Sequence, residues 1–406
     1  MKVVIAPDSF KECLGAAEVA SAMARGVLEA CPEALVDLCP MADGGEGTVA
    51  AMVAATGGKL VAADVFDPLG RPMRAHFGLL GLPMQSNLPG EIGLAAAVAQ
   101  AGGDGAGSAG GRTTAVVETA AASGLSLVPN DKRDPLRTTT FGTGLLIRAA
   151  LDAGANEIIV GLGGSATVDG GCGAAQALGV VFRDSAGREL IRGLGGGRLS
   201  EIAEIDTRGL DTRLAGVRIR LACDVTHPLC GPNGAAAVFG PQKGATAEMV
   251  VQLEAGLSNL AACIRRKLGI DVADLRGSGA AGGLGAGLVA LAGAVMDSGV
   301  EIVASAVGLR HRLSGADLCI TGEGRLDSQS RSGKTAVGVA AIARELGVPV
   351  VCIPGSATVD APHEAFAAVL PLAGGEVTAA MAMRKADALL THRTAQALKR
   401  IIGKTE

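Results

Sequence analysis

The sequence predicts an α/β fold in which a flavodoxin-like, doubly wound parallel sheet is built from both chain ends. A second α/β domain, containing a mixed sheet, is inserted between them. Three observations lead to this prediction: apolar runs alternate with helical patterns at both ends, Gly-rich turns break that rhythm in the middle, and 406 residues suit two domains. Five short buried strands separated by helices favour an open parallel sheet, for which right-handed crossovers make 2-1-3-4-5 the simplest strand order.

The N-terminal elements follow a strand–helix rhythm. The apolar run KVVIAP over 2–7 predicts a buried strand, and the helical pattern over 16–30 predicts the helix that follows it. A second run, 34–39, leads through the turn ADGGEG to a helix of small residues over 48–55.

The same rhythm returns near the C-terminus. The sequence predicts strands at 317–321, 348–353 and 367–370, a helix over 335–346 between the first two, and a charged helix from about 377 to 402. Together with the N-terminal elements, these complete the predicted five-stranded sheet.

The middle of the chain is predicted to form the inserted domain. Its strands are expected at 62–66, 73–79, 113–118, 158–162 and 217–224. We therefore predict a discontinuous flavodoxin-like domain of 1–62 plus 286–406, with an inserted mixed-sheet domain at 63–285. The segment 86–112 is Gly-rich and nearly free of bulky side chains, which predicts a surface excursion or a flap.

Composition excludes several classes of function. The formal net charge of −4, the absence of Trp and Tyr and the seven Phe leave neither a basic surplus nor stacking platforms for nucleic acid. Nine dispersed Cys without a C-x-x-C pair indicate free thiols in a reducing compartment, and no secretion signal is expected, so we expect a cytoplasmic protein. The uncharged stretch 277–296 is better explained as a packed interior helix than as a membrane span.

Polar residues gather where the predicted strands end, and ligands of doubly wound sheets bind at that edge. These residues are Asp8, Ser9 and Lys11 after the first strand, Asp43 after the second, Glu323 and Arg325 after 317–321, Gly163, Gly164, Ser165 and Asp169 after 158–162, and Asp224 after 217–224.

Each of these residues has a structural explanation when taken alone, because Asp caps helices and Gly permits tight turns. Together, carboxylates that can hold Mg²⁺, cations that neutralise phosphate and exposed backbone N–H groups are typical of phosphoryl transfer. Lys334 adds to this set, since Gly-Lys-Thr at 333–335 opens the predicted helix and helix N-termini attract anions.

Two other motifs are weaker indicators. GSGAAG at 277–282 matches the dinucleotide-binding pattern G-x-G-x-x-G, but no strand clearly precedes it. SQSRSGKT at 328–335 ends like a P-loop but lacks the first Gly. The five His lack the spacing of a zinc site, and no G-x-S-x-G nucleophile motif occurs.

A series of longer segments resembles the type I glycerate kinase family, in order, from residue 1 to about 400. These segments are APDSFKECLGAAEVA (6–20), ADGGEGT (42–48), DPLGRP (67–72), TTTFGTGLLIRAAL (138–151), GLGGSATVDGG (161–171), ACDVTHPLCG (222–231), FGPQKGA (239–245), GAAGGLGAGL (279–288) and TGEGRLDSQSRSGKTAVGVA (321–340). Val168 and His227 stand where the family usually has Asn.

The resemblance implies phosphorylation of D-glycerate by ATP with Mg²⁺, generally at the 2-position, in a cleft between two domains. On this hypothesis Lys11, Arg325 and Lys334 neutralise the carboxylate and the transferred phosphate. Asp43, Asp169 and Asp224 hold Mg²⁺ or accept the hydroxyl proton. Backbone contacts to phosphate would come from Gly163, Gly164 and Ser165 with Gly282 and Gly283, and Asp8, Ser9 and Glu323 belong to the same binding site.

Alternatives remain open at the level of sequence. Phosphorylation at the 3-position depends on substrate placement that residues alone do not specify. A glycerate-binding protein without kinase activity is a second alternative, and a hydroxy-acid oxidoreductase, suggested only by GSGAAG, is a third. The composition allows a homodimer but identifies no face for it.

Overall fold

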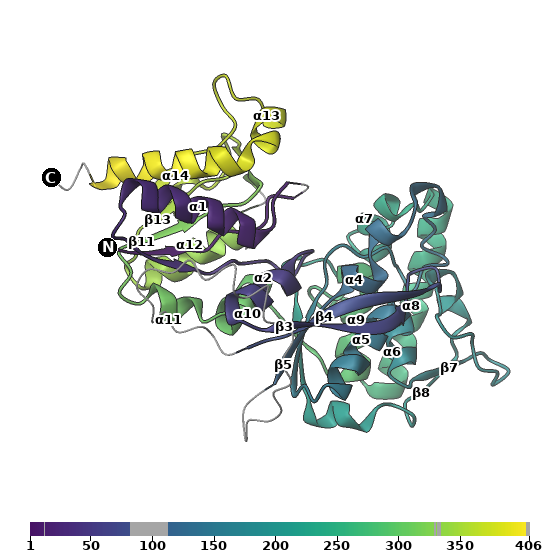
Figure 1. The fold of residues 1–406 in the computed structure, drawn as a ribbon. Helices are drawn as coiled ribbons and strands as arrows, with labels where there is room; N and C mark the ends of the chain where they lie inside the picture. The colour runs from purple at the N-terminus through teal and green to yellow at the C-terminus, as the bar shows by residue number, and fades with distance from the viewer. Residues whose placement is uncertain (12, 82–112, 329, 331–333, 403–406) are drawn as a thin grey trace.

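The computed structural model describes residues 1–11, 13–81, 113–328, 330 and 334–402, so the predicted excursion at 86–112 lies outside the described residues. Two large sheets form its framework (Figure 1). The purple N-terminal segment lies beside the green and yellow C-terminal segments in one half of the molecule, whereas the teal middle of the chain forms the other half. The mixed α/β fold agrees with the prediction.

The first sheet has the order β15-β13-β11-β1-β2, and all its strands are parallel. Its strands are β1 (Lys2–Ile5), β2 (Leu35–Leu38), β11 (Leu318–Thr321), β13 (Val350–Cys352) and β15 (Ala368–Val369). Numbered along this half of the molecule, that order is 2-1-3-4-5, so the flavodoxin-like prediction is confirmed.

Helices cover both faces of this sheet. They are α1 (Ala16–Ala30), α2 (Thr48–Thr56), α10 (Gly299–Ala306), α11 (Leu309–Leu313), α12 (Thr335–Glu345), α13 (Ala379–Arg384) and α14 (Ala386–Ile402). Because side chains alternate along a strand, Val3 and Ile5 pack toward α1 and α14, whereas Val4 packs toward α2, α10 and α12. The C-terminal helix predicted over 377–402 is therefore two helices.

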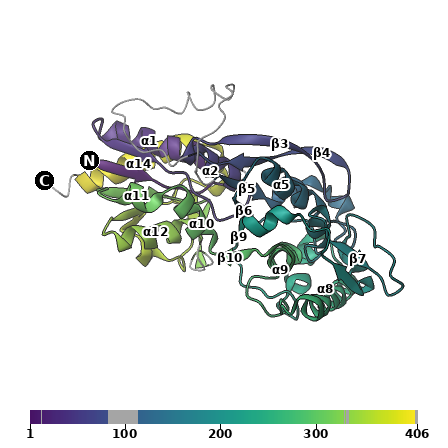
Figure 2. The same cartoon turned by 90° about the horizontal axis from the view of Figure 1, so that it is seen from below.

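The second sheet has the order β10-β9-β6-β5-β4-β3 (Figure 2). Its strands are β3 (Lys59–Phe66), β4 (Pro72–Leu79), β5 (Thr114–Glu118), β6 (Glu157–Gly161), β9 (Arg218–Ala222) and β10 (Val295–Asp297). The four strands from β5 to β10 are parallel, and β4 pairs antiparallel with both β3 and β5. The predicted mixed sheet is thus present, with β10 as a strand that the sequence analysis did not identify.

The remaining elements mostly surround the second sheet. They are α4 (Thr119–Ser123), α5 (Phe141–Asp152), α6 (Cys172–Ala177), α7 (Ala235–Phe239), α8 (Ala247–Leu268), α9 (Ala280–Ala292) and the hairpin of β7 (Val181–Arg183) and β8 (Glu204–Asp206). In the half of the molecule that contains the first sheet, β12 (Arg325–Leu326) pairs with β14 (Ser356–Ala357). Nearly all of α9 is buried, as expected for a packed interior helix. Within the described residues, no helix is both long and apolar enough to cross a bilayer.

Helices α2 and α10 lie between the two sheets. Val116 of β5 and Ile159 of β6 belong to the same buried cluster as Val4 of β1, together with apolar side chains of both helices. One hydrophobic core therefore joins the inner faces of both sheets. The predicted domain boundaries, 62/63 and 285/286, fall inside β3 and α9, and we propose to move them to the chain just before β3 and just after β10.

A buried ion pair ties α11 to β2 and α2. The Arg312 guanidinium donates to the Asp37 carboxylate and, at 2.8 Å, to the carbonyl of Ala55, and the side chains of Arg312 and Asp37 are only 5% and 6% exposed. Removing one partner of such a pair leaves a buried charge without compensation.

We expect Arg312→Met to lower the free energy of unfolding by about 3–5 kcal/mol, since it strands the Asp37 carboxylate. Urea titration followed by circular dichroism measures this loss. Arg310→Met is the matched control on the same helix, because the partners of Arg310 among the described residues, Glu301 and Glu345, are exposed, and its effect should stay within about 1 kcal/mol. Equal losses for both variants would contradict the assigned role of the buried pair.

Candidate active site

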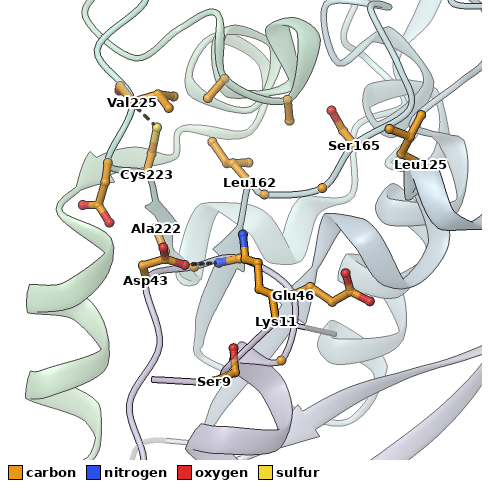
Figure 3. A pocket seen from close by; sticks show the side chains of 18 of the residues that line it. Ser9, Lys11, Asp43, Glu46, Leu125, Leu162, Ser165, Ala222, Cys223 and Val225 are labelled. Atoms are coloured by element: carbon orange, nitrogen blue, oxygen red, sulfur yellow. Dashed lines mark hydrogen bonds between the residues drawn. The ribbon is translucent and has the colours of Figure 1, made fainter. Parts of the chain in front are cut away.

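A pocket of about 830 Å³ opens where loops after β1, β2, β6 and β9 converge. Figure 3 shows Asp43, Cys223 and Ser165 around this opening, with Ser9 and Lys11 approaching it from the first half of the chain. The pocket brings together seven of the predicted site residues: Ser9, Lys11, Asp43, Gly163, Gly164, Ser165 and Asp224. The carboxyl ends of parallel strands from both sheets thus supply one site.

Glycines allow the two loop systems to touch. The backbone N–H of Gly163 donates to the carbonyl of Gly44 at 3.3 Å. A Cβ on Gly161 would lie 2.4 Å from that carbonyl oxygen, and one on Gly163 would lie 2.7 Å from the Cα of Gly45. A side chain at either position would force the loops apart, so these glycines serve the contact between the two halves as well as any ligand.

Asp43 and Asp224 face the pocket from opposite sheets. Asp43 accepts a hydrogen bond from the backbone of Gly45 at 2.9 Å, and Asp224 accepts one from Gly299, the first residue of α10, at 2.9 Å. Burial, followed by the charge of Asp43, raises the pKa of Asp224 to about 6. At neutral pH Asp224 is therefore mainly ionised and more basic than an exposed carboxylate.

The pair has the chemistry expected for Mg²⁺. The Oδ2 atom of Asp224 is buried and has no hydrogen-bond partner among the described residues, and Asp43 is near enough for its charge to act on Asp224. Mg²⁺ usually takes one or two carboxylates together with water and substrate phosphates. The described residues contain no cluster of three or more His, Cys, Asp or Glu side chains in metal-binding geometry. A metal ion held by this carboxylate pair would therefore take its other ligands from water and substrate phosphates.

A second group of predicted residues lies beside the pocket, in the half of the molecule that contains the first sheet. Asp8 accepts from the backbone of Ser9 at 2.6 Å and from Thr335 Oγ1 at 2.5 Å. Burial, then the nearby Asp43 carboxylate, raises its pKa to about 6. Asp8 does not line the pocket, but it holds the backbone of Ser9, which does.

Glu323 lies near Asp8 and is almost fully buried. Ser330 Oγ donates to its Oε1 at 2.9 Å, and burial raises its pKa to about 7, with Lys334 acting in the opposite direction. Lys334 forms an ion pair with Asp327 at 3.7 Å, and the largely exposed Arg325 pairs with the same carboxylate at 3.4 Å. Glu323, Arg325 and Lys334 do not line the pocket in this structure.

Three predicted residues form the packing beneath the pocket loop. Asp169 is fully buried and accepts four hydrogen bonds, from the backbone and hydroxyl of Thr140 at 2.7 Å each, from Gly171 at 3.1 Å and from Gly173 at 3.2 Å. Gly282 and Gly283 have φ of 69° and 91°, and a Cβ on Gly282 would lie 1.9 Å from the carbonyl oxygen of Thr167. The structure places all three away from the pocket lining.

The GSGAAG motif has a structural role. No strand lies between α8 and α9, so the described chain lacks the strand–turn–helix setting that a dinucleotide fingerprint requires. Instead, Ala281, Gly282 and Gly283 make a left-handed turn before the regular part of α9, and Gly282 accepts a hydrogen bond from Gly170 at 3.0 Å. The motif thus fixes α9 against the loop that follows β6.

Lys243 is a pocket residue that the sequence analysis did not identify. Its Nζ donates to Ser165 Oγ and to the carbonyl of Thr167, both at 2.7 Å, although the side chain comes from a short 3-10 turn at Pro241–Lys243. Burial lowers its pKa to about 7, while the charge of Asp169 opposes the shift. The only available signal was the segment FGPQKGA, where Pro and Gly indicate a tight turn around the lysine.

The two positions that differ from the family pattern have ordinary structural surroundings. Val168 is fully buried in an apolar cluster with Leu229. The ring of His227 packs edge-on against Phe239 at 5.1 Å, and its Nδ1 lies 3.0 Å from the carbonyl of Asn233. All nine Cys are free thiols, as predicted.

Comparisons with known proteins agree with this architecture. The family model described as "Glycerate kinase family" matches residues 3–402. A glycerate kinase of Bacillus subtilis (strain 168) is 50% identical over 89% of this chain and 86% of its own length. A glycerate 2-kinase of Escherichia coli (strain K12) is 49% identical with the same coverage.

A solved structure extends the similarity to three dimensions. A crystal structure from Salmonella typhimurium LT2, assigned as a glycerate kinase 2, has a TM-score of 0.84 and 45% identity, covering 100% of this chain and 99% of that chain. The chain therefore belongs to the glycerate kinase family.

The buried Glu323 carboxyl makes stability depend on pH. Its pKa is about 7 in the folded state against a usual value of 4.5, so between these pH values the folded protein binds more protons than the unfolded chain. Its contribution to the free energy of unfolding therefore falls as pH rises through this window. We expect Glu323→Gln, which can still accept from Ser330, to become progressively more stable than the wild type between pH 5 and pH 8.

Urea titrations at both pH values check this expectation, with the exposed Glu33→Gln as the control. A difference in unfolding free energy that stays constant with pH would contradict the assignment of the titration to Glu323.

Proposed function

We propose that this member of the glycerate kinase family transfers the γ-phosphoryl group of ATP to the 2-hydroxyl of D-glycerate, with Mg²⁺, in the pocket between the two sheets. The observation that carries the proposal is the convergence of Asp43 and Asp224 with Lys11 and Lys243 around one opening at the carboxyl edges of both sheets. Phosphoryl transfer depends mainly on positioning and charge neutralisation, which such a set supplies. The 49% identity to a glycerate 2-kinase supports the 2-position.

The reaction needs a cationic and a carboxylate component. Lys11 is exposed at the pocket rim and would neutralise phosphate oxygens of ATP. Arg325 and Lys334 would join it if the two halves of the molecule close over the ligands, since both lie in the half that also carries Lys11. When bound, Mg²⁺ would neutralise charge that develops on the phosphate oxygens.

The carboxylates divide the remaining work. Asp43 would hold the metal, and Asp224, with its unpartnered Oδ2, would accept the hydroxyl proton. The glycerate 2-oxygen forms a bond to the γ-phosphorus, the bond from that phosphorus to the β–γ bridging oxygen breaks, and ADP leaves. Asp169 would act indirectly, because its hydrogen bonds fix the loop that carries Ser165.

The first experiment is ³¹P NMR of the products after incubation with MgATP and D-glycerate. A monoester resonance of 2-phosphoglycerate is expected, whereas 3-phosphoglycerate would keep the kinase and move the reacting oxygen. No monoester from folded protein would contradict the proposed reaction and favour a binding protein. Absorbance of a reduced nicotinamide cofactor would then test the oxidoreductase alternative.

We expect Lys11→Ala and Asp43→Ala each to lower kcat/KM by about 10²–10³-fold, because Lys11 would neutralise the transferred phosphate directly and Asp43 would hold the Mg²⁺ that neutralises it. A coupled assay of ADP release measures the loss, and circular dichroism confirms the fold. Lys59→Ala, an exposed lysine on β3 away from the pocket, should retain wild-type turnover. Near-normal turnover in both site variants would show that the pocket is not where transfer occurs.

A further inference from the structure

We propose that Lys243 and Ser165 form the subsite for the carboxylate of the acceptor substrate. The inference rests on the proposed glycerate kinase activity and assigns a task to a buried lysine in the pocket wall. Lys243 is 3% exposed and Ser165 is 6% exposed, yet both line the pocket. An anion reaching them would therefore be largely removed from water.

Lys243 and Ser165 each have one donor hydrogen that can bind a ligand. An ammonium has three N–H groups, and Lys243 uses two of them on Ser165 Oγ and the carbonyl of Thr167. Within the described part of the chain, no contact is found for its third N–H or for the hydroxyl hydrogen of Ser165. Two adjacent donors, one of them charged, match the two oxygens of a carboxylate.

The charge on Lys243 lacks a direct counter-ion. Asp169 is the carboxylate whose charge acts on it, but the described side chains contain no ion pair between them, and Asp169 is already held by four hydrogen bonds. A buried ammonium in this state is costly, as its lowered pKa indicates. An anionic ligand at its third N–H would supply the missing charge.

The lysine is rigidly positioned for such a contact. The N–H of Lys243 donates to Gly240 at 3.0 Å, and Gly244 ends the turn with a φ of 96°. A Cβ on Gly244 would lie 2.4 Å from the carbonyl of Arg133, so the turn is also pressed against a neighbouring segment. A fixed, buried donor pair suits a small carboxylate, whereas the exposed Lys11 suits the larger triphosphate.

The test compares glycerate with its neutral amide, glyceramide, as phosphoryl acceptors. In Lys243→Met we expect kcat/KM for glycerate to fall by about 10²-fold, because a buried charge-assisted contact is lost. The value for glyceramide should change by less than about threefold, and KM for ATP by about twofold at most. Ser165→Ala should show a smaller loss, about tenfold, that is also confined to glycerate.

Two variants serve as controls for charge and folding. Lys243→Gln keeps two side-chain N–H donors without a charge, on a side chain one bond shorter than that of lysine. It should repeat the loss of preference for glycerate over glyceramide if Lys243→Met fails to fold. Lys267→Met, an exposed lysine on α8, should leave both acceptors unchanged. The unfolding midpoint of each variant reports whether the structure is intact.

Two results would overturn the subsite. A rise in KM for ATP with unchanged KM for glycerate would assign Lys243 to the nucleotide, and equal losses for glycerate and glyceramide would leave it a structural role. Calorimetric titration of D-glycerate into wild type and Lys243→Met separates the two proposals. If wild type binds glycerate but forms no phosphate ester, the kinase proposal fails, while weaker binding by the variant would still support the subsite.

Discussion

The structure depends on two helices, α2 and α10, that are packed between the sheets and held at their N-termini by carboxylates of the second sheet. Glu118, at the end of β5, accepts from the backbone of Val49 in α2 at 2.6 Å. Asp224, just after β9, accepts from Gly299 of α10 at 2.9 Å. A helix N-terminus carries unpaired N–H groups and partial positive charge. Each carboxylate therefore accepts from one of these N–H groups and also holds the helix at a defined distance from the second sheet. The pocket edges are therefore set by the same contacts that join the two halves.

The pocket also concentrates unfavourable charge before any ligand arrives. Burial and, after it, the charge of Asp43 raise the pKa of Asp8 and of Asp224, so Asp43 repels each of these two carboxylates across the strand ends. On the facing wall, burial disfavours the protonated form of Lys243. The charged forms of these groups are unfavourable in the ligand-free protein. Bound Mg²⁺ would reduce the repulsion among the carboxylates, and a bound anion would compensate the charge of Lys243. Such preorganisation is how a site gains differential stabilisation of charge that develops during reaction.

The sequence was sufficient to predict those features that follow from the order of strands along the chain. Asp43 and Asp224 could be predicted because the carboxyl ends of parallel strands share an edge, and the strand order followed from the crossover rule. It was insufficient where a contact depends on packing between distant segments. Lys243 reaches Ser165 across 78 positions through a three-residue turn, which no periodic pattern encodes. Asp169 resembled a ligand because it follows a strand in a Gly-rich loop, and only the four donors around it reveal its structural use.

The parallel pairing of β1 with β11, in register from Val3 opposite Leu318, has a consequence for biosynthesis. During translation β1 can pair early with β2, which follows it after the single helix α1, but its other neighbour, β11, exists only after more than three hundred further residues have been added. Every strand of the second sheet, from β3 to β10, leaves the ribosome in that interval. The inserted unit can therefore fold first, while the apolar face of the N-terminal strands waits without its covering helix α14. Chaperone protection would be needed most by the oldest part of the nascent chain.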